Sequence, residues 1–415
     1  MRHRSTPANF TLLVAAAAVV AVLAAVPAAA ETSPYYVGIS QTFSRESNLL
    51  RLRDGQAPAA GDSESDTIST TALVAGIDQR FGRQRVSGSA SLRSNAYSNN
   101  KRFNGQGYNG TLALDWQTIE NLSGNVTIGA DRTLRADLRD RFGQFVVGRN
   151  TESRARFTAS ANLGLAGPLG LEAAVGSNST KYSAEATDYA AYREDFASAG
   201  VRYRLGGATS VSLGLRQTRT EYPNLLIELP DPRDKRKRND IDLGLVWVPS
   251  GATRLDARIS QGKTTHEQRE DRDFSGSSGA VTWGWSPTGK LRLNTRLARD
   301  IGQNSQFNTA GTSAYSQTTD SLRFAADYEL TGKIALTSAL QIYKRNLERF
   351  AQLQGTFSGS DTTNVFTLGG RWVPLRSLSV GCQASLEKRG KSSNILLNEP
   401  YSANAFSCFG QLVLQ

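Results

Sequence analysis

Long hydrophobic runs are almost missing from this chain of 415 residues. Outside residues 11–26, no segment approaches the roughly 20 consecutive apolar residues that a membrane-spanning helix needs. The hydrophobic fraction is 39%, whereas globular domains usually reach about 45–50%. The sequence therefore excludes a helical membrane protein and offers little material for a large central core.

Histidine is scarce as well, and only His266 lies beyond the first thirty residues. Its context HEQRE departs from the His-Glu-x-x-His zinc pattern, and we expect it in a solvated loop. The glycine-rich segments 105–110 (GQGYNG) and 284–291 (GWSPTGKL) imitate nucleotide-binding motifs but lack the flanking strand and helix or the terminal Ser/Thr. We therefore predict no catalytic residue, no metal site and no cofactor, and the chain is not expected to be an enzyme.

The N-terminal segment has the pattern of a signal peptide. Arg2 and Arg4 precede the apolar run, and the small residues 27–30 (PAAA) end it. We expect residues 1–30 to be cleaved and residues 31–415 to be exported. An uncleaved membrane anchor is the alternative.

The rest of the chain is built from a unit that recurs about every 40 residues. In each unit two alternating runs meet at a tight turn containing Gly or Pro, and a longer polar loop precedes the next unit. The tight turns lie at 81–85, 120–124, 166–170, 205–209, 249–253, 286–290, 330–333 and 373–377. Among the longer loops we expect segments 45–66, 221–240 and 353–363.

The runs alternate with a period of two, which is typical of strands whose two faces differ. In segment 321–330, Leu322, Phe324 and Tyr328 share one face, and Arg323 shares the other with Asp327. Eighteen such runs occur between residues 35 and 415. They predict an all-β fold, an outer-membrane antiparallel β-barrel of about 18 strands with short periplasmic turns and longer extracellular loops. A soluble propeller is the alternative, but its blades need four short strands in each unit.

Aromatic residues gather near the short turns. A membrane interface selects amphipathic aromatic rings at strand ends. We therefore predict that the following residues form an interface girdle: Trp116, Trp247, Trp285 and Trp372. Phe81, Tyr203 and Tyr328 hold comparable positions.

The two cysteines, Cys382 and Cys408, lie on the apolar faces of the last two runs. Pairing these runs about a loop centred near Ile395 places the two residues directly opposite each other. Opposed residues of a non-hydrogen-bonded pair lie within disulfide reach, and disulfides persist in exported proteins. The spacing predicts a disulfide, and two small buried thiols are the alternative.

The polar faces of the runs carry many charges that would line the barrel lumen. The candidate lumen cations are Arg93, Arg135, Arg202, Arg216, Arg254, Arg258, Arg292, Arg296, Arg323 and Arg371. Acidic residues lie among them. This mixture indicates either a structural ladder between strands or a selectivity lining for anions, and the sequence does not decide between them.

The formal net charge of +11 suits anionic partners. The basic cluster 234–240 (DKRKRND) lacks the interleaved aromatics of nucleic-acid sites. We interpret it as an exposed loop that faces anionic sugars or lipopolysaccharide, and we expect no nucleic-acid partner.

The segments 33–52 (SPYYVGISQTFSRESNLLRL), 66–97, 112–127 (LALDWQTIENLSGNVT) and 401–415 (YSANAFSCFGQLVLQ) resemble the EpsL family. That family comprises outer-membrane barrels associated with exopolysaccharide biosynthesis and the exosortase/PEP-CTERM system of Gram-negative bacteria. The resemblance covers essentially the whole mature chain. It implies a role in the synthesis or export of an exopolysaccharide, and it supplies no catalytic residue.

Three functions follow from these patterns. The first is a passage for an anionic exopolysaccharide, or an anchor for periplasmic export components, in the lipid of the outer membrane. The second is a general diffusion porin for small solutes, in which loop 45–66 or loop 221–240 folds inward as a constriction. The third is an enzyme or adhesin displayed on the outer loops.

Overall fold

The computed structural model describes residues 33–135, 149–165, 167–224, 234–267, 273–308, 311–351, 355–391 and 400–415, without the side chains of 302–317 and 347–357. The expected signal peptide, residues 1–30, lies outside the described residues. Two short 3-10 helices, η1 (Lys101–Phe103) and η2 (Glu185–Ala190), accompany eighteen strands. The strands are β1 (Tyr35–Glu46), β2 (Asp66–Phe81), β3 (Gln84–Tyr97), β4 (Gly105–Gln117), β5 (Leu122–Leu134), β6 (Thr151–Gly164), β7 (Leu169–Tyr182), β8 (Tyr192–Leu205), β9 (Thr209–Tyr222), β10 (Asp234–Ser250), β11 (Thr253–His266), β12 (Phe274–Trp285), β13 (Leu291–Asn308), β14 (Gly311–Thr331), β15 (Ile334–Ala351), β16 (Gly355–Leu375), β17 (Leu378–Arg389) and β18 (Tyr401–Leu414).

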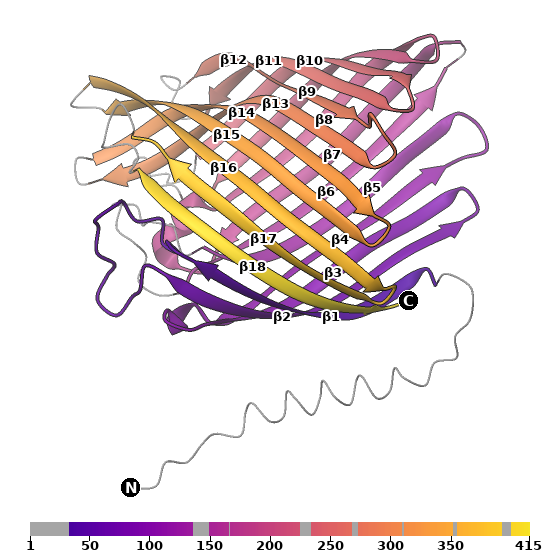
Figure 1. Cartoon of the computed structure of the whole chain (residues 1–415). Helices are drawn as coiled ribbons and strands as arrows, with labels where there is room; N and C mark the ends of the chain where they lie inside the picture. Colours follow the sequence, from indigo (N-terminus) through magenta and orange to yellow (C-terminus); the bar gives the residue numbers. More distant parts are fainter. Residues whose placement is uncertain are drawn as a thin grey trace, which may run out of the picture.

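The eighteen strands form one closed barrel (Figure 1). Each strand pairs antiparallel with the next one along the chain, and β1 also pairs with β18, so that Val37 lies opposite Leu414. Closure leaves no strand edge unpaired, which a barrel in a lipid environment requires. The predicted fold class and strand number are confirmed.

The two ends of the barrel differ in their connections. Short turns gather at one end, where β1 begins and β18 ends, and the longer loops lie at the other (Figure 1). At three of the turns Gly82, Gly167 and Gly206 adopt positive φ angles of 61°, 76° and 68°, which only glycine reaches without strain. The tight turns occur where the Gly and Pro residues predicted them.

Large hydrophobic side chains cover the outer face of the strands. On β9 Leu213 and Leu215 are 59% and 65% exposed, while Arg216 points to the opposite face. This alternation runs through the barrel and places charged and small polar residues inside. The outer face therefore suits contact with lipid.

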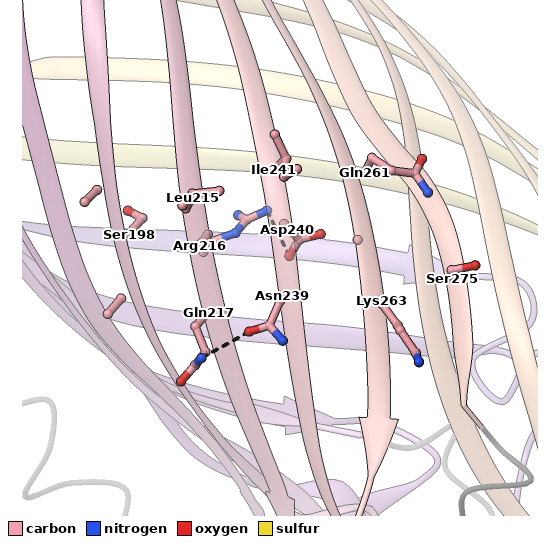
Figure 2. A pocket seen from close by; sticks show the side chains of 13 residues that line it. Ser198, Leu215, Arg216, Gln217, Asn239, Asp240, Ile241, Gln261, Lys263 and Ser275 are labelled. Carbon is pink, nitrogen blue, oxygen red and sulfur yellow. Dashed lines mark hydrogen bonds and ion pairs between the residues drawn. The ribbon is translucent and has the colours of Figure 1, made fainter.

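The strands extend past this apolar surface at the loop end. They are 12 to 21 residues long, whereas crossing a membrane takes about 9–11 residues. Figure 2 shows the transition, with Leu215 and Ile241 followed along the same outer face by Gln217, Asn239 and Lys263. The Gln217 amide donates to the Asn239 carbonyl oxygen at 3.0 Å. Beyond the apolar surface both faces of the wall are thus polar.

Two segments predicted as loops are strand for this reason. Residues 234–240 form the start of β10, and residues 355–363 form the start of β16. Where both faces meet water, the period-two contrast between apolar and polar residues disappears. The expected loops 353–363 and 221–240 were therefore largely wrong, although residues 225–233 lie outside the described residues.

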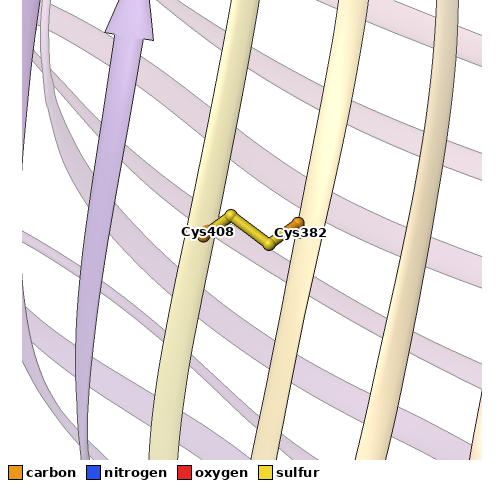
Figure 3. Close-up of a disulfide and its surroundings, with 2 residues drawn as sticks. All are labelled: Cys382 and Cys408. Carbon is orange, nitrogen blue, oxygen red and sulfur yellow. A yellow bond between two sulfur atoms is a disulfide. The ribbon is translucent and has the colours of Figure 1, made fainter.

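The last two strands are joined covalently on the outer face (Figure 3). Cys382 lies directly opposite Cys408 in the register of β17 and β18. Their sulfur atoms form a disulfide, with the Cα atoms 4.0 Å apart. The bond lies close to the seam where β18 meets β1 and closes the barrel.

Candidate functional site: the barrel lumen and its mouth

The inner wall of the barrel is the candidate site because the functional side chains converge there. All ten predicted arginines occupy inward positions, with Arg135 directly after the end of β5 and the others within strands. Strand alternation fixes this direction, since their sequence neighbours, such as Leu92, Val201 and Leu215, are exposed on the outer face. Their surroundings divide them into two groups.

Six of the ten form ion pairs with carboxylates of the inner wall. Arg216 lies 3.2 Å from Asp242, which also binds Arg258 at 2.9 Å. The other pairs are Arg254–Asp256 at 2.7 Å, Arg292–Glu329 at 2.5 Å, Arg202–Glu172 and Arg135–Glu152. These arginines belong to ladders across the wall.

The most developed ladder joins β9, β10 and β11. Asp240 accepts from Arg238 at 2.8 Å and lies 3.6 Å from Arg216. The Ser260 hydroxyl donates to Asp242 at 2.5 Å. A Cβ at Gly262 would lie 2.1 Å from Asp240 Oδ1, so only glycine leaves room for this carboxylate. Arg238, Asp240 and Gly262 were not among the sequence candidates, because the cluster 234–240 was interpreted as a loop.

The remaining four candidates, Arg93, Arg296, Arg323 and Arg371, form no ion pair within the described part of the chain. Arg296 and Arg323 lie directly opposite each other on β13 and β14. Arg296 Nη1 donates to the Thr282 hydroxyl at 3.2 Å. Arg371 faces a hollow of about 490 Å³ near the short turns, which Arg292 and Gln383 also line. Asp327 and Glu329 line the same hollow as Arg371 without forming an ion pair with it.

The connection between β1 and β2, residues 47–65, folds back against the inner wall, and we call it the mouth loop. Leu50 and Leu52 are 4% and 1% exposed and pack on Ile68, Tyr97 and Phe103. This cluster places apolar side chains on the inner wall at the loop end of the barrel. The mouth loop falls within the predicted loop 45–66, and its role as an inward constriction stays a prediction.

Polar contacts also fix the mouth loop. Arg51 bridges Glu46 on β1 at 2.9 Å and Glu387 on β17 at 3.0 Å. The Asn48 amide donates to the carbonyl oxygens of Leu52 at 2.8 Å and Ser402 at 3.1 Å. The mouth loop therefore crosses the seam of the barrel and joins its first strand to its last two.

Asp66, at the start of β2, anchors the neighbouring loop. It is 1% exposed and accepts from the backbone N–H groups of Thr67, Asn99 and Asn100 at 2.7, 3.0 and 2.7 Å, and from the Asn100 amide at 2.8 Å. Burial by itself would raise the pKa of Asp66, but these hydrogen bonds outweigh it and lower the pKa below the ordinary value. The carboxylate is thus held ionised without a cation.

His266 is not in a solvated loop, contrary to the prediction. It is the last residue of β11 and is 4% exposed, because its position points inward. Its backbone N–H donates to Asp273 at 2.9 Å, and its Nδ1 lies 3.6 Å from the same carboxylate. Within the described residues no group of acidic, His and Cys side chains is arranged to hold a metal ion.

The predicted interface aromatics all lie on the outer face near the short turns. Trp247, Trp285 and Trp372 are 42%, 39% and 52% exposed, and Trp116 is half-buried near the end of β4. Trp283 was not among the candidates. It stacks on Trp285 with ring centroids 5.7 Å apart.

A helix of sufficient length and apolarity to cross a membrane does not occur in the described part of the chain.

The sequence matches no protein-family model and no curated protein. Among solved structures the chain is similar to the outer membrane protein opdK from Pseudomonas aeruginosa, with 13% identity, 92% of this chain and 99% of that chain covered, and a TM-score of 0.45. It is also similar to OccK9 (OpdG) from Pseudomonas aeruginosa, with 13% identity, coverage of 92% and 98%, and a TM-score of 0.43. The FrpB iron transporter from Neisseria meningitidis is also similar, with 9% identity, 92% of this chain and 82% of that chain covered, and a TM-score of 0.44. Likenesses this distant concern the fold and carry no argument about function.

Proposed function

We propose that the chain is an outer-membrane channel that passes small water-soluble solutes and prefers anions. The observation that carries this proposal is the wall itself, which is apolar outside and charged inside over eighteen closed strands. Barrels of 16–18 strands leave an aqueous channel, whereas small barrels are filled by their own side chains. A polar inner wall keeps such a channel hydrated.

The mouth loop favours small solutes over a polymer. Leu50, Leu52 and Arg51 fix it to the inner wall by an apolar cluster and two ion pairs, and we propose that it narrows the end through which a chain of sugars would leave. This geometry supports the diffusion-channel reading of the sequence over the polymer passage. The unpaired lumen arginines supply the anion preference.

Outward-facing charges support an outer-membrane setting with the loops outside. Arg219, Lys237 and Lys263 are exposed on the outer face at the loop end, beyond the apolar surface. Cations at such a level suit the anionic headgroups of a membrane leaflet. Lipid of the outer membrane is accordingly the first partner that we propose.

A role in exopolysaccharide export is the second candidate, and the resemblance of four segments to the EpsL family favours it. In that role the barrel serves as a passage for an anionic exopolysaccharide or as an anchor for periplasmic export components. Deleting the gene and measuring surface polysaccharide separates the two functions. An unchanged amount of polysaccharide contradicts the export role and leaves the channel proposal standing.

Planar bilayers test the channel proposal. Purified protein should insert and produce stepwise conductance, and the reversal potential in a KCl gradient should show preference for chloride. Liposome swelling with a series of neutral sugars should show faster entry of monosaccharides than of tetrasaccharides. Folded protein that inserts without conductance would overturn the proposal.

A further inference from the structure

A hollow of about 310 Å³ lies in the inner wall beside the mouth loop. Its lining includes Arg93 and Tyr97 of β3, Gly105 and Gly107 of β4, and Arg149 just before β6. By strand alternation Arg93, Tyr97, Gly105 and Gly107 point inward. The hollow is thus open to a solute that enters the lumen from the loop end.

Two glycines make room for two guanidinium groups. A Cβ at Gly105 would lie 2.4 Å from Arg149 Cζ, and a Cβ at Gly107 would lie 2.9 Å from Arg93 Nε. A side chain at Gly105 would displace Arg149, and one at Gly107 would meet both Arg93 and the Arg132 carbonyl oxygen, which lies 2.8 Å from the added Cβ. The sequence GQGYNG, whose glycines have no nucleotide-binding context, therefore has a role in seating Arg93 and Arg149.

The carboxylates around the hollow are already occupied. Glu46 binds Arg51, and Glu152 binds both Arg135 and Arg154. Asp66, the third, is satisfied by backbone N–H groups and by the Asn100 amide.

Arg93 has a single hydrogen bond, from Nη2 to the Arg132 carbonyl oxygen at 3.4 Å. In the described part of the chain neither Arg93 nor Arg149 forms an ion pair. Both guanidinium groups therefore keep free donors directed at the hollow.

We propose that this hollow binds the oxyanion of a small solute, a carboxylate or phosphate on a sugar-sized molecule. Guanidinium groups bind such planar or tetrahedral oxyanions through paired N–H donors. The volume accommodates a monosaccharide acid beside the Tyr97 and Phe103 rings, which lie 5.9 Å apart below it. This inference rests on the proposed channel and names the solute class that it selects.

Current block in single channels tests the site. Glucuronate, glucose 6-phosphate and glucose are added separately at the loop side, and the concentration that halves the open time is measured. For the unmodified chain both anions should act at concentrations at least tenfold below that of glucose. Block by only one of the two assigns the site to carboxylate or to phosphate.

The double variant Arg93→Gln/Arg149→Gln should raise the blocking concentration of the effective anion at least tenfold. Gly105→Val keeps the net charge but displaces Arg149, and it should raise the same concentration several-fold. Lys263→Gln is the matched control, because it removes one cation from the exposed outer face and should leave block unchanged. Only folded and inserted barrels carry current, so a variant that folds poorly still reports on the site.

Equal block in the unmodified chain and the double variant would overturn the site. Block by glucose at the same concentration as by both anions in the unmodified chain would do the same. These outcomes leave the channel proposal intact, because the barrel still conducts. Absence of conductance in the unmodified chain contradicts the channel itself.

Discussion

Arginines of the inner wall occur in two surroundings, with and without a carboxylate partner. This difference separates structural from functional arginines. At β9–β11, Arg216 and Arg258 share the carboxylate of Asp242. At the mouth, Arg93 and Arg149 face the hollow without an ion pair in the described residues. Both groups point into the lumen, so orientation does not distinguish them. The two groups differ in whether a carboxylate is available on the neighbouring strands.

The two arrangements have different energetic consequences. A shared carboxylate fixes its arginines to one geometry and cancels their charge, which stabilises the wall and weakens the local potential. An arginine without a partner stays hydrated by lumen water at little cost and keeps its charge for a ligand. Variants that move an arginine from one group to the other therefore test whether the available carboxylates set the lumen charge.

The largest expected loss of stability lies outside both regions and serves as a control. Replacing Cys382 and Cys408 together by Ala removes the crosslink over a separation of 26 residues. The free energy of unfolding should fall by about 3 kcal/mol, because the unfolded chain regains loop entropy. Urea titration in lipid vesicles measures this fall, and the chloride preference should stay unchanged. A changed preference would show that the β17–β18 seam shapes the lumen.

Asp242→Ala should convert the ladder into a second unpaired region. It leaves Arg216 and Arg258 without their shared carboxylate and should cost about 2 kcal/mol of unfolding free energy. The value lies below that of a fully buried pair, because Arg258 is 46% exposed. Chloride preference in bilayers should rise, since Arg258 loses its ion pair and Arg216 keeps only Asp240 at 3.6 Å. A stable variant with unaltered preference would mean that carboxylate supply does not set the lumen charge.

Acid should loosen the mouth loop by protonating Asp66. Hydrogen bonds lower the pKa of Asp66, so its stabilising contribution is fully present above the unfolded-state value of about 3.9 and disappears as the pH falls through the lowered folded value. Proteolysis of the mouth loop at pH values between about 2 and 5 should increase at the acid end. The variant Asp66→Asn should be cut at every pH, and a cleavage profile that is flat for the unmodified chain would contradict this role.

The smallest effect is expected for Asp256→Asn. Its partner Arg254 is 60% exposed and Asp256 itself 41%, so lumen water screens the pair. The unfolding free energy should change by less than about 1 kcal/mol. Comparison with Asp242→Ala in the same urea titration then measures how far burial, rather than pairing alone, stabilises the ladders. Equal losses for the two variants would remove burial as the explanation.

The sequence predicted the barrel because the physics of each strand is local. Leu213 and Leu215 against Arg216 define a period of two, and Gly82 or Gly206 defines a turn, without reference to any other strand. The pattern failed where strands leave the apolar surface, as at 234–240 and 355–363. There both faces meet water, and composition resembles that of a loop.

The candidate site was predictable only in part. The sequence placed Arg93, Arg216 and Arg258 on the lumen face, yet it left open whether they form ladders or a lining. It did not include Arg149, which lies outside a strand and follows residues 136–148, beyond the described residues. It interpreted Gly105 and Gly107 as ordinary strand glycines, because the atoms they make room for belong to distant segments.

The closed wall is predictable from the sequence alone: the number of strands, their two faces, the turns, and the opposition of Cys382 and Cys408. Period and spacing suffice for these features, since each depends on residues a few positions apart or on one hairpin. Only the tertiary structure decided which lumen arginines are neutralised and which stay free. Ion pairs across the wall depend on the register between strands and on the path of the mouth loop, because these decide how close each arginine lies to a carboxylate.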